Sequence, residues 1–476
     1  MSIRIRLTRL GARRDVTGIE PSCGVMDIRW GSRIYRVVTD CGLIPVRAQE
    51  TGQDPTWHVP DLSFFQDDIP IDAVRITHVH GDHAGFLPAL APYLSPKAKV
   101  WMTGPSEAMI GRVFEDGLSA FSRSSRTPLF DERDVALINQ RIRRRFRPGP
   151  FEILPGITDY VHPEGHIGGA CSFTSDVGGR IIHYSGDRCS HDQPGVRGAL
   201  PLPPEWWPHV IANSDCTYGA DPDSDQRTWQ AEMDRGIEIC AQTLKSGAPV
   251  LFCTFGIHRG GAVAHELRRH GVPDIAPVYL DGACRHFTEI ALSDRGRWSE
   301  SDTLLQLDGV RMIDHEVHRR NYVLQDHDAY AVVTTPGMGG PGGAASFWRR
   351  HVLPNPDALL VFTGYLAPDT DGARILQADA ERRRTGVIPV LTFEDTDPQG
   401  RPRVEKLPLR CRVLQIRIGA HDSQGKIADW FRGYRPETAV LCHGSEASLA
   451  SLASQLEGDI DQVVRSDLQR TVELEF

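Results

Sequence analysis

Short apolar runs alternate along the chain with longer segments in which apolar residues recur at helical spacing. The short runs predict buried β-strands and the longer segments predict amphipathic helices. The predicted strands cover residues 33–39, 74–77, 99–102, 180–184, 210–213, 250–254, 329–334, 358–362, 412–416 and 438–442. Because the two kinds of segment alternate, the sequence favours an α/β fold over a β-sandwich or a helical bundle.

The predicted helices include residues 131–145, 228–246, 261–270, 424–431 and 447–456. The last of these follows Ser445, whose hydroxyl suits an N-cap. The glycine-rich stretch 336–343 predicts a loop. Five of the ten predicted strands are followed directly by Asp, His or Ser, and residues just beyond such ends are where open α/β sheets bind ligands.

One strand end stands out because potential metal ligands crowd into it. The predicted strand 74–77 is followed by a turn that contains Gly81 and four such side chains, those of His78, His80, Asp82 and His83. Extended residues two apart point the same way, so His78 and His80 can face one metal ion while Asp82 and His83 face another. This density of imidazole and carboxylate groups has few purely structural uses.

A single loop cannot complete two metal shells, so further ligands must come from distant strand ends. Three candidates occur beside glycines at the ends of apolar runs: His166, Asp187 and His443. Glycine allows the backbone a close approach at such positions. Each residue alone could equally be a loop or capping residue, and the conjunction of the three is what favours a metal site.

Composition narrows the class of protein. The chain has 476 residues, a formal net charge of -9 and ten scattered cysteines without a Cys-x-x-Cys pair. The charge argues against a protein that coats nucleic acid non-specifically, and the cysteine spacing predicts buried free thiols rather than disulfides. We expect a cytoplasmic protein, because the sequence has neither a membrane-length apolar stretch nor a secretory signal.

These motifs resemble those of the metallo-β-lactamase superfamily and, within it, the β-CASP nucleases. The resemblance covers nearly the whole chain and rests on Thr39-Asp40-Cys41-Gly42, the run from His78 to His83, Gly165-His166, Gly186-Asp187, Asp215-Cys216, Ala420-His421-Asp422 and Cys442-His443-Gly444. It implies an αββα metallo-β-lactamase sandwich with an inserted α/β β-CASP cap domain. The implied domains are residues 1–213, the cap at 214–405, and residues 406–476.

The resemblance also implies a role for each residue of the site. His78, His80 and His166 would bind one zinc ion, Asp82, His83 and His443 a second, and Asp187 would bridge the two. His421 would be the general acid, Asp215 its carboxylate partner, and Asp40 would orient a histidine ligand. For His421 the alternative is a helix cap or core histidine, and for Asp40 a turn carboxylate.

His443 favours RNA as the substrate, because RNA-directed members of the family carry histidine there. The expected function is zinc-dependent hydrolysis of single-stranded RNA by a two-metal mechanism, with an endonuclease favoured and 5′ exonuclease activity open. Alternatives are a nuclease or phosphodiesterase with another substrate, such as DNA, and a catalytically silent nucleic-acid-binding scaffold. A homodimer is expected by resemblance only.

The candidate substrate contacts lie between the metal motifs, in the predicted cap. They are His258, Arg259, Met338, Gly339, Gly340, Thr363, Gly364 and Tyr365. Arginine clusters at 141–147 and 382–384 could extend a track for phosphates, although each could also be a solvated helix face.

Overall fold

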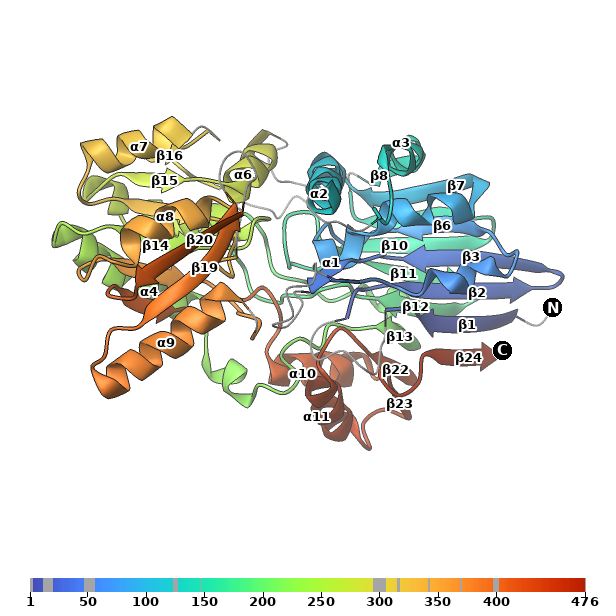
Figure 1. The fold of residues 1–476 in the computed structure, drawn as a ribbon. Helices are drawn as coiled ribbons and strands as arrows, with labels where there is room; N and C mark the ends of the chain where they lie inside the picture. Colours follow the sequence, from blue (N-terminus) through green and yellow to red (C-terminus); the bar gives the residue numbers. More distant parts are fainter. Residues whose placement is uncertain are drawn as a thin grey trace. The chain divides into compact units, whose positions relative to one another are not determined.

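The computed structural model describes residues 3–11, 20–46, 56–122, 127–145, 147–293, 305–314, 317–340, 343–368, 370–396 and 402–475. The chain forms two compact units (Figure 1). Unit 1 contains residues 1–226, 296–302 and 420–476, and unit 2 contains residues 227–295 and 303–419. The chain therefore leaves unit 1, builds unit 2 and returns.

Unit 1 contains two seven-stranded sheets within the described residues. The first has the strand order β24-β1-β2-β3-β6-β7-β8. Its strands are β1 (Ile3–Arg9), β2 (Gly24–Trp30), β3 (Arg33–Thr39), β6 (Ile71–Arg75), β7 (Leu94–Thr103), β8 (Ile142–Arg145) and β24 (Thr471–Glu475). The short pair β4 (Ile44–Val46) and β5 (Thr56–His58) lies outside both sheets.

The second sheet has the order β23-β22-β13-β12-β11-β10-β9. Its strands are β9 (Gly149–Leu154), β10 (Ile157–Pro163), β11 (Cys171–Val177), β12 (Arg180–Tyr184), β13 (Val210–Asn213), β22 (Thr438–Leu441) and β23 (Gln462–Arg465). One core joins the two sheets, since Met26 and Val37 of the first pack in the same cluster as Ile182 and Val210 of the second. The sheets therefore share one hydrophobic core.

The helices of unit 1 are α1 (Gly81–Ala84), α2 (Gly104–Ser122), α3 (Glu132–Arg141), α10 (Gln424–Tyr434) and α11 (Glu446–Leu456). Helices α2 and α3 contact β7 of the first sheet, and α11 contacts β22 and β23 of the second. None of the described helices of the protein is long and apolar enough to cross a lipid bilayer.

Unit 2 is built on a parallel sheet of order β16-β15-β17-β14-β18-β21. Its strands are β14 (Val250–Cys253), β15 (Val278–Leu280), β16 (Val310–Met312), β17 (Ala331–Thr334), β18 (Leu359–Phe362) and β21 (Arg412–Gln415). Val250 and Phe252 belong to the core on one face, and Leu251 and Cys253 to the core on the other. Burial on both faces explains why these strands are uninterrupted apolar runs in the sequence.

The helices of unit 2 are α4 (Trp229–Lys245), α5 (Arg259–Arg269), α6 (Ala283–Ser293), α7 (Val317–Asp326), α8 (Ala344–Val352) and α9 (Asp371–Thr385). A separate antiparallel hairpin consists of β19 (Val390–Thr396) and β20 (Pro402–Pro408).

The chain thus has the mixed α/β fold that the sequence predicts, and all ten cysteines are buried free thiols, as expected. One predicted element is wrong in part. The expected helix 131–145 ends at Arg141, and Ile142–Arg145 form β8, which pairs in parallel with β7. A run of arginines carries little periodic apolar signal, so sequence periodicity could not separate the edge strand from the helix before it.

Candidate metal centre

The run from His78 to His83 is held in place by backbone hydrogen bonds to a neighbouring loop. The amide groups of Ser22, Cys41 and Leu43 donate to the carbonyl groups of Asp82, His83 and Gly81, respectively. Gly42 approaches this run so closely that a Cβ atom there would lie 1.7 Å from the carbonyl oxygen of Asp82. A side chain at position 42 would therefore displace the residues that carry the imidazoles.

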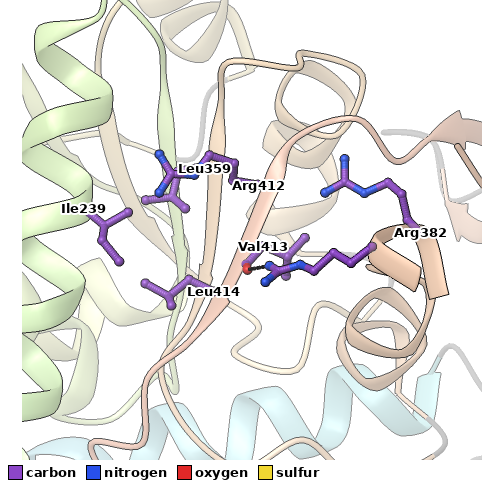
Figure 2. A pocket seen from close by; sticks show the side chains of 7 residues that line it. Ile239, Leu359, Arg382, Arg412, Val413 and Leu414 are labelled. Carbon is purple, nitrogen blue, oxygen red and sulfur yellow. Dashed lines mark hydrogen bonds between the residues drawn. The ribbon is translucent and has the colours of Figure 1, made fainter. Parts of the chain in front are cut away.

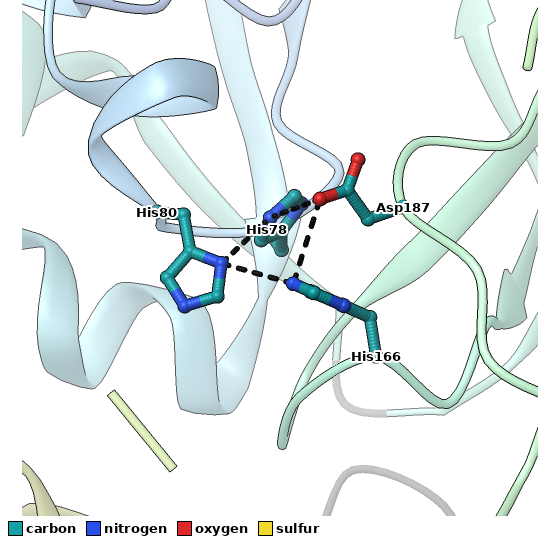
Figure 3. Close-up of side chains that lie close together, drawn as sticks. All are labelled: His78, His80, His166 and Asp187. Carbon is teal, nitrogen blue, oxygen red and sulfur yellow. Dashed lines mark hydrogen bonds and ion pairs between the residues drawn. The ribbon is translucent and has the colours of Figure 1, made fainter. Parts of the chain in front are cut away.

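The first group of side chains consists of His78, His80, His166 and Asp187, which converge from three segments (Figure 3). The Nδ1 atom of His80 lies 3.2 Å from Nε2 of His78 and 3.0 Å from Nε2 of His166. Oδ2 of Asp187 lies 3.6 Å from Nε2 of His78 and 3.5 Å from that of His166. Three ring nitrogens and one carboxylate oxygen thus face a common point.

The second group consists of Asp82, His83 and His443. Here the other carboxylate oxygen of Asp187, Oδ1, lies 3.1 Å from Nε2 of His83 and 3.3 Å from Nε2 of His443. Nε2 of His443 is 3.8 Å from Oδ2 of Asp82. Asp187 therefore lies between the two groups and presents one oxygen atom to each.

The chemistry of these donors fits a metal centre. Nε2 of His83, Oδ1 of Asp187 and Nε2 of His443 are buried and have no hydrogen-bond partner among the described residues. Burial lowers the pKa of His80 to about 4 and holds that of His78 well below its usual range. Imidazoles that stay neutral near pH 7 keep the lone pair that a metal ion requires.

Charge within the cluster is balanced by its carboxylates. Burial alone would raise the pKa of Asp187. The neighbouring imidazole groups have a larger and opposite effect, so this pKa lies well below its usual range. They belong to His443, His83, His166 and His78. Burial also disfavours the charged form of His83, yet the carboxylates of Asp187 and Asp40 raise its pKa. The carboxylate of Asp187 is therefore ionised, which is the form that can bind a metal ion.

Asp40 contacts the ring nitrogen of His83 that faces away from the centre. Its Oδ2 atom lies 2.9 Å from Nδ1 of His83, and the Thr77 amide and hydroxyl groups each donate to its carboxylate at 2.8 Å. Nδ1 of His166 lies 2.6 Å from the carbonyl oxygen of Ala420 in the same way. Such contacts to the outer nitrogen fix the direction of the other nitrogen, which faces the cluster.

His421 and Asp215 form a close pair beside the first group. Nδ1 of His421 lies 2.6 Å from Oδ2 of Asp215, and the rings of His421 and His166 are 4.6 Å apart. Burial opposes ionisation of Asp215, but the charge of His421 lowers its pKa. The ring of His421 is 17% exposed, so it can meet a substrate while Asp215 keeps its orientation.

Comparisons with known proteins find relatives over most of the chain, although no family model matches it. The chain is 26% identical over 474 residues to "Ribonuclease TTHA0252" of Thermus thermophilus, covering 95% of this chain and 96% of the relative. It is 24% identical over 425 residues to the "RNase J-like protein" of Methanocaldococcus jannaschii, with 88% and 89% covered. The same organism's "Transcription termination factor FttA" is 24% identical over 435 residues, with 88% of this chain but only 64% of that relative covered.

These relatives, 23–26% identical over most of the chain, support the β-CASP metallo-β-lactamase family for it. Among solved structures, it resembles a protein of unknown function from Enterococcus faecalis V583 with a TM-score of 0.56. That alignment covers 99% of this chain and 100% of the other at 11% sequence identity, so it supports the fold alone.

A partly buried arginine that was not predicted from the sequence connects the segments of the site; its side chain is 12% exposed. The guanidinium group of Arg188 is paired with Asp422 and lies 3.4 Å from Oε2 of Glu164. Its backbone amide donates to Oδ2 of Asp215 at 3.1 Å, and its carbonyl oxygen accepts from the Asp422 amide. Arg188 follows Asp187 and Asp422 follows His421, so adjacency to site residues was the only available signal.

The candidate substrate contacts lie in unit 2, after the carboxyl ends of β14, β17 and β18, which are adjacent in its sheet. His258 has a φ of 65° and Arg259 begins α5, while Tyr365 is 56% exposed. The hydroxyl of Thr363 donates to the carbonyl of Cys253, which holds the Thr363-Gly364-Tyr365 turn against β14.

The Met338-Gly339-Gly340 turn is fixed by contacts to its carbonyl groups. Gly372 donates to the carbonyl of Met338 at 2.9 Å, and the buried guanidinium of Arg349 donates to that of Gly339 at 2.9 Å. Parallel strands bind ligands at their carboxyl ends, so the structure gathers the three predicted contact segments at one edge of the unit 2 sheet.

Proposed function

We propose that the chain is a two-zinc ribonuclease that hydrolyses phosphodiester bonds of single-stranded RNA, mainly as an endonuclease. The observation that carries this proposal is the position of Asp187, which presents one oxygen atom to each of two imidazole groups. His78, His80 and His166 would hold one zinc ion, and Asp82, His83 and His443 the other. Metal-dependent hydrolysis is the activity that such an arrangement supports.

We propose the αββα sandwich with a β-CASP cap for the fold, with domains at 1–213, 214–405 and 406–476. The shared core of the two unit 1 sheets supports the sandwich. The division of unit 1 by unit 2 supports an inserted cap, although both junctions of the compact units lie somewhat further along the chain.

Bound zinc would lower the pKa of a water ligand to about 7 and stabilise charge on the phosphate oxygens. The protein supplies the other parts of the reaction. Asp40 and the carbonyl of Ala420 orient the rings of His83 and His166. His421 carries a proton toward the leaving oxygen, while Asp215 holds its Nδ1 atom and stabilises the charged ring.

RNA is the proposed substrate because relatives that align with most of this chain are named ribonucleases or RNase J-like proteins. His258, Arg259, the Met338-Gly339-Gly340 turn and the Thr363-Gly364-Tyr365 turn are the proposed contacts to it. A cytoplasmic location, a homodimer and residual 5′ exonuclease activity stay predictions from the sequence.

The test is incubation of the purified protein with 5′-labelled single-stranded RNA, DNA of the same sequence, and a bis-nitrophenyl phosphodiester. Each reaction is run as purified, with chelator, and with zinc restored. We expect zinc-dependent internal fragments from RNA on a denaturing gel, whereas mononucleotides would indicate 5′ exonuclease action. Preferential cleavage of DNA, or no cleavage by zinc-loaded protein, would contradict the proposal.

A further inference from the structure

The two sheets of unit 1 each end in a strand whose outer edge is unpaired within the described residues, β8 in the first and β9 in the second. Five basic and aromatic side chains gather around these strands. They are Lys99 and Trp101 of β7, Arg143 and Arg145 of β8, and Phe151 of β9, and we call them the basic–aromatic edge.

Strand register shows that these residues share one face. Arg75 pairs with Trp101, Trp101 with Arg143, and Thr103 with Arg145. The guanidinium group of Arg75 donates to Asp159 in the second sheet, so this face is the one directed toward that sheet. Arg143 and Arg145 therefore lie at the margin between the two sheets.

The side chains of the edge are in contact with one another. The rings of Trp101 and Phe151 are 4.8 Å apart, the guanidinium of Arg145 lies 4.5 Å from the centre of Phe151, and Lys99 lies 5.6 Å from the centre of Trp101. Nε1 of Trp101 and Nε of Arg145 have no hydrogen-bond partner among the described residues. Cationic groups interleaved with aromatic rings are the combination that binds single-stranded nucleic acids.

The positive charge of this edge is largely uncompensated. Residues 141–147 contain five arginines in a chain of net charge -9. Within the described part of the chain, Arg144 pairs with Glu107, whereas Arg143 and Arg145 form no ion pair with a carboxylate. The guanidinium group of Arg143 donates instead to the carbonyl of Ile142 at 2.7 Å.

The second arginine cluster, at 382–384, is used internally (Figure 2). Arg382 and Arg383 both pair with Asp379 of the same helix, and Arg384 pairs with Glu381. Arg382 also donates to the carbonyl of Cys411, and Arg383 to that of Val413, beside a cavity of about 300 Å³. The guanidinium groups of Arg382 and Arg383 thus donate to backbone carbonyl groups along the open edge of β21. Of the two clusters, only the one at 141–147 retains positive charge that can bind a partner.

The basic–aromatic edge begins beside the metal centre. Thr103, which pairs with Arg145, donates through its hydroxyl group to the carbonyl of Gly169 at 2.8 Å, in the loop that carries His166. From there Arg145 and Arg143 follow β8 outward at intervals of about 6.6 Å, the repeat of same-face residues in a strand. That interval is comparable to the spacing of successive phosphates in an extended single strand.

We propose that the basic–aromatic edge binds the backbone of single-stranded RNA beyond the bond to be cleaved, with Arg143 and Arg145 contacting phosphates and Trp101 or Phe151 stacking on a base. The proposal rests on the proposed RNA substrate but not on cleavage. It predicts that long RNA binds more tightly than RNA too short to reach β8.

The test is fluorescence anisotropy of the full chain with labelled oligouridylates of 6 and 40 nucleotides, in chelator and at 50–200 mM salt. Each phosphate contact contributes about 0.7 to the salt slope for single strands. The double variant Arg143→Gln/Arg145→Gln should therefore lower the slope for the long RNA by about 1.4 and weaken its binding at 50 mM salt by about sevenfold or more. Binding of the short RNA should not change.

Two further variants control for charge and folding. Arg384→Gln/Arg403→Gln removes the same charge from exposed positions in unit 2 and should leave the slope unchanged, and Arg143→Lys/Arg145→Lys should retain most of it. Equal slopes for the two Gln double variants would overturn the proposal. The proposal would also be overturned if Arg143→Gln/Arg145→Gln changed the oligomeric state of the protein but left its RNA binding unaltered. That result would assign the edge to pairing with a protein strand. Binding is measured without cleavage. An inactive wild-type protein would therefore refute the proposed function but would not refute RNA binding by the basic–aromatic edge.

Discussion

Replacement of His421 by alanine tests whether this residue donates a proton to the leaving group or binds a metal ion. His421 is not one of the seven proposed ligands, yet Asp187, Asp215 and His421 lie close enough together to hold a metal ion themselves. If His421 is the general acid, His421→Ala should retain both zinc ions and lose about 10²- to 10⁴-fold in kcat. That loss corresponds to about 2.7–5.5 kcal/mol of transition-state stabilisation.

Asp215→Asn should lower kcat less than His421→Ala does, for a reason that lies in the hydrogen bonds of Asp215. Oδ2 of Asp215 faces His421 and accepts from the Arg188 amide, while Oδ1 accepts from the amide and hydroxyl groups of Thr217. An asparagine amide nitrogen cannot accept at either position, so at least one of these hydrogen bonds is lost. Hydrogen bonds to charged groups contribute about 1.5–3 kcal/mol, which predicts a 10- to 100-fold lower kcat.

The assay combines zinc content by mass spectrometry with kcat for RNA and for a nitrophenyl phosphodiester. A nitrophenolate leaving group needs no proton, so His421→Ala should affect the nitrophenyl substrate far less than RNA. Loss of zinc from His421→Ala, or an equal loss of rate on both substrates, would refute the assignment of His421 as the acid.

Three other predictions follow from named contacts. Asp82→Ala should lower bound zinc and RNA cleavage together, and full zinc content measured in an inactive protein would contradict its role as a ligand. Arg188→Met should lower kcat about tenfold or more, because Asp422 loses a charge-assisted hydrogen bond; partial recovery in Arg188→Lys separates loss of charge from misfolding. Asp281 is buried and accepts from Arg320 at 2.7 Å, so Asp281→Ala should lower the free energy of unfolding by about 3–5 kcal/mol, measured in urea, and unchanged stability would contradict it.

The sequence predicted the parallel strands of unit 2 well, and the ligand-type side chains that it singled out do lie together, because both leave local signals. Strands such as Leu359–Phe362 are buried on both faces and are therefore apolar throughout, and His78 to His83 concentrate four ligand-type side chains in one turn. The antiparallel strands β9 and β10, which largely alternate in burial, were not predicted, and neither was β11, which is almost wholly buried.

Contacts between distant residues were beyond the reach of sequence patterns. The ion pair of Arg188 with Asp422 joins residues 234 positions apart, and nothing beside either residue marks the other. The arginines of β8 resemble a solvated helix face in the sequence. Only their register against β7 shows that they alternate between the two faces of a sheet.

The pairing of β24 with β1 has a consequence for biosynthesis. A ribosome adds about 5–20 residues per second, so the last strand emerges roughly half a minute to a minute and a half after the first. Until then the nascent first sheet lacks its terminal strand, and the centre lacks His443, which follows β22. All of unit 2 is translated before either arrives. A chain interrupted within unit 2 therefore carries an incomplete set of the proposed ligands, which ties the onset of nuclease activity to synthesis of the segment that follows unit 2.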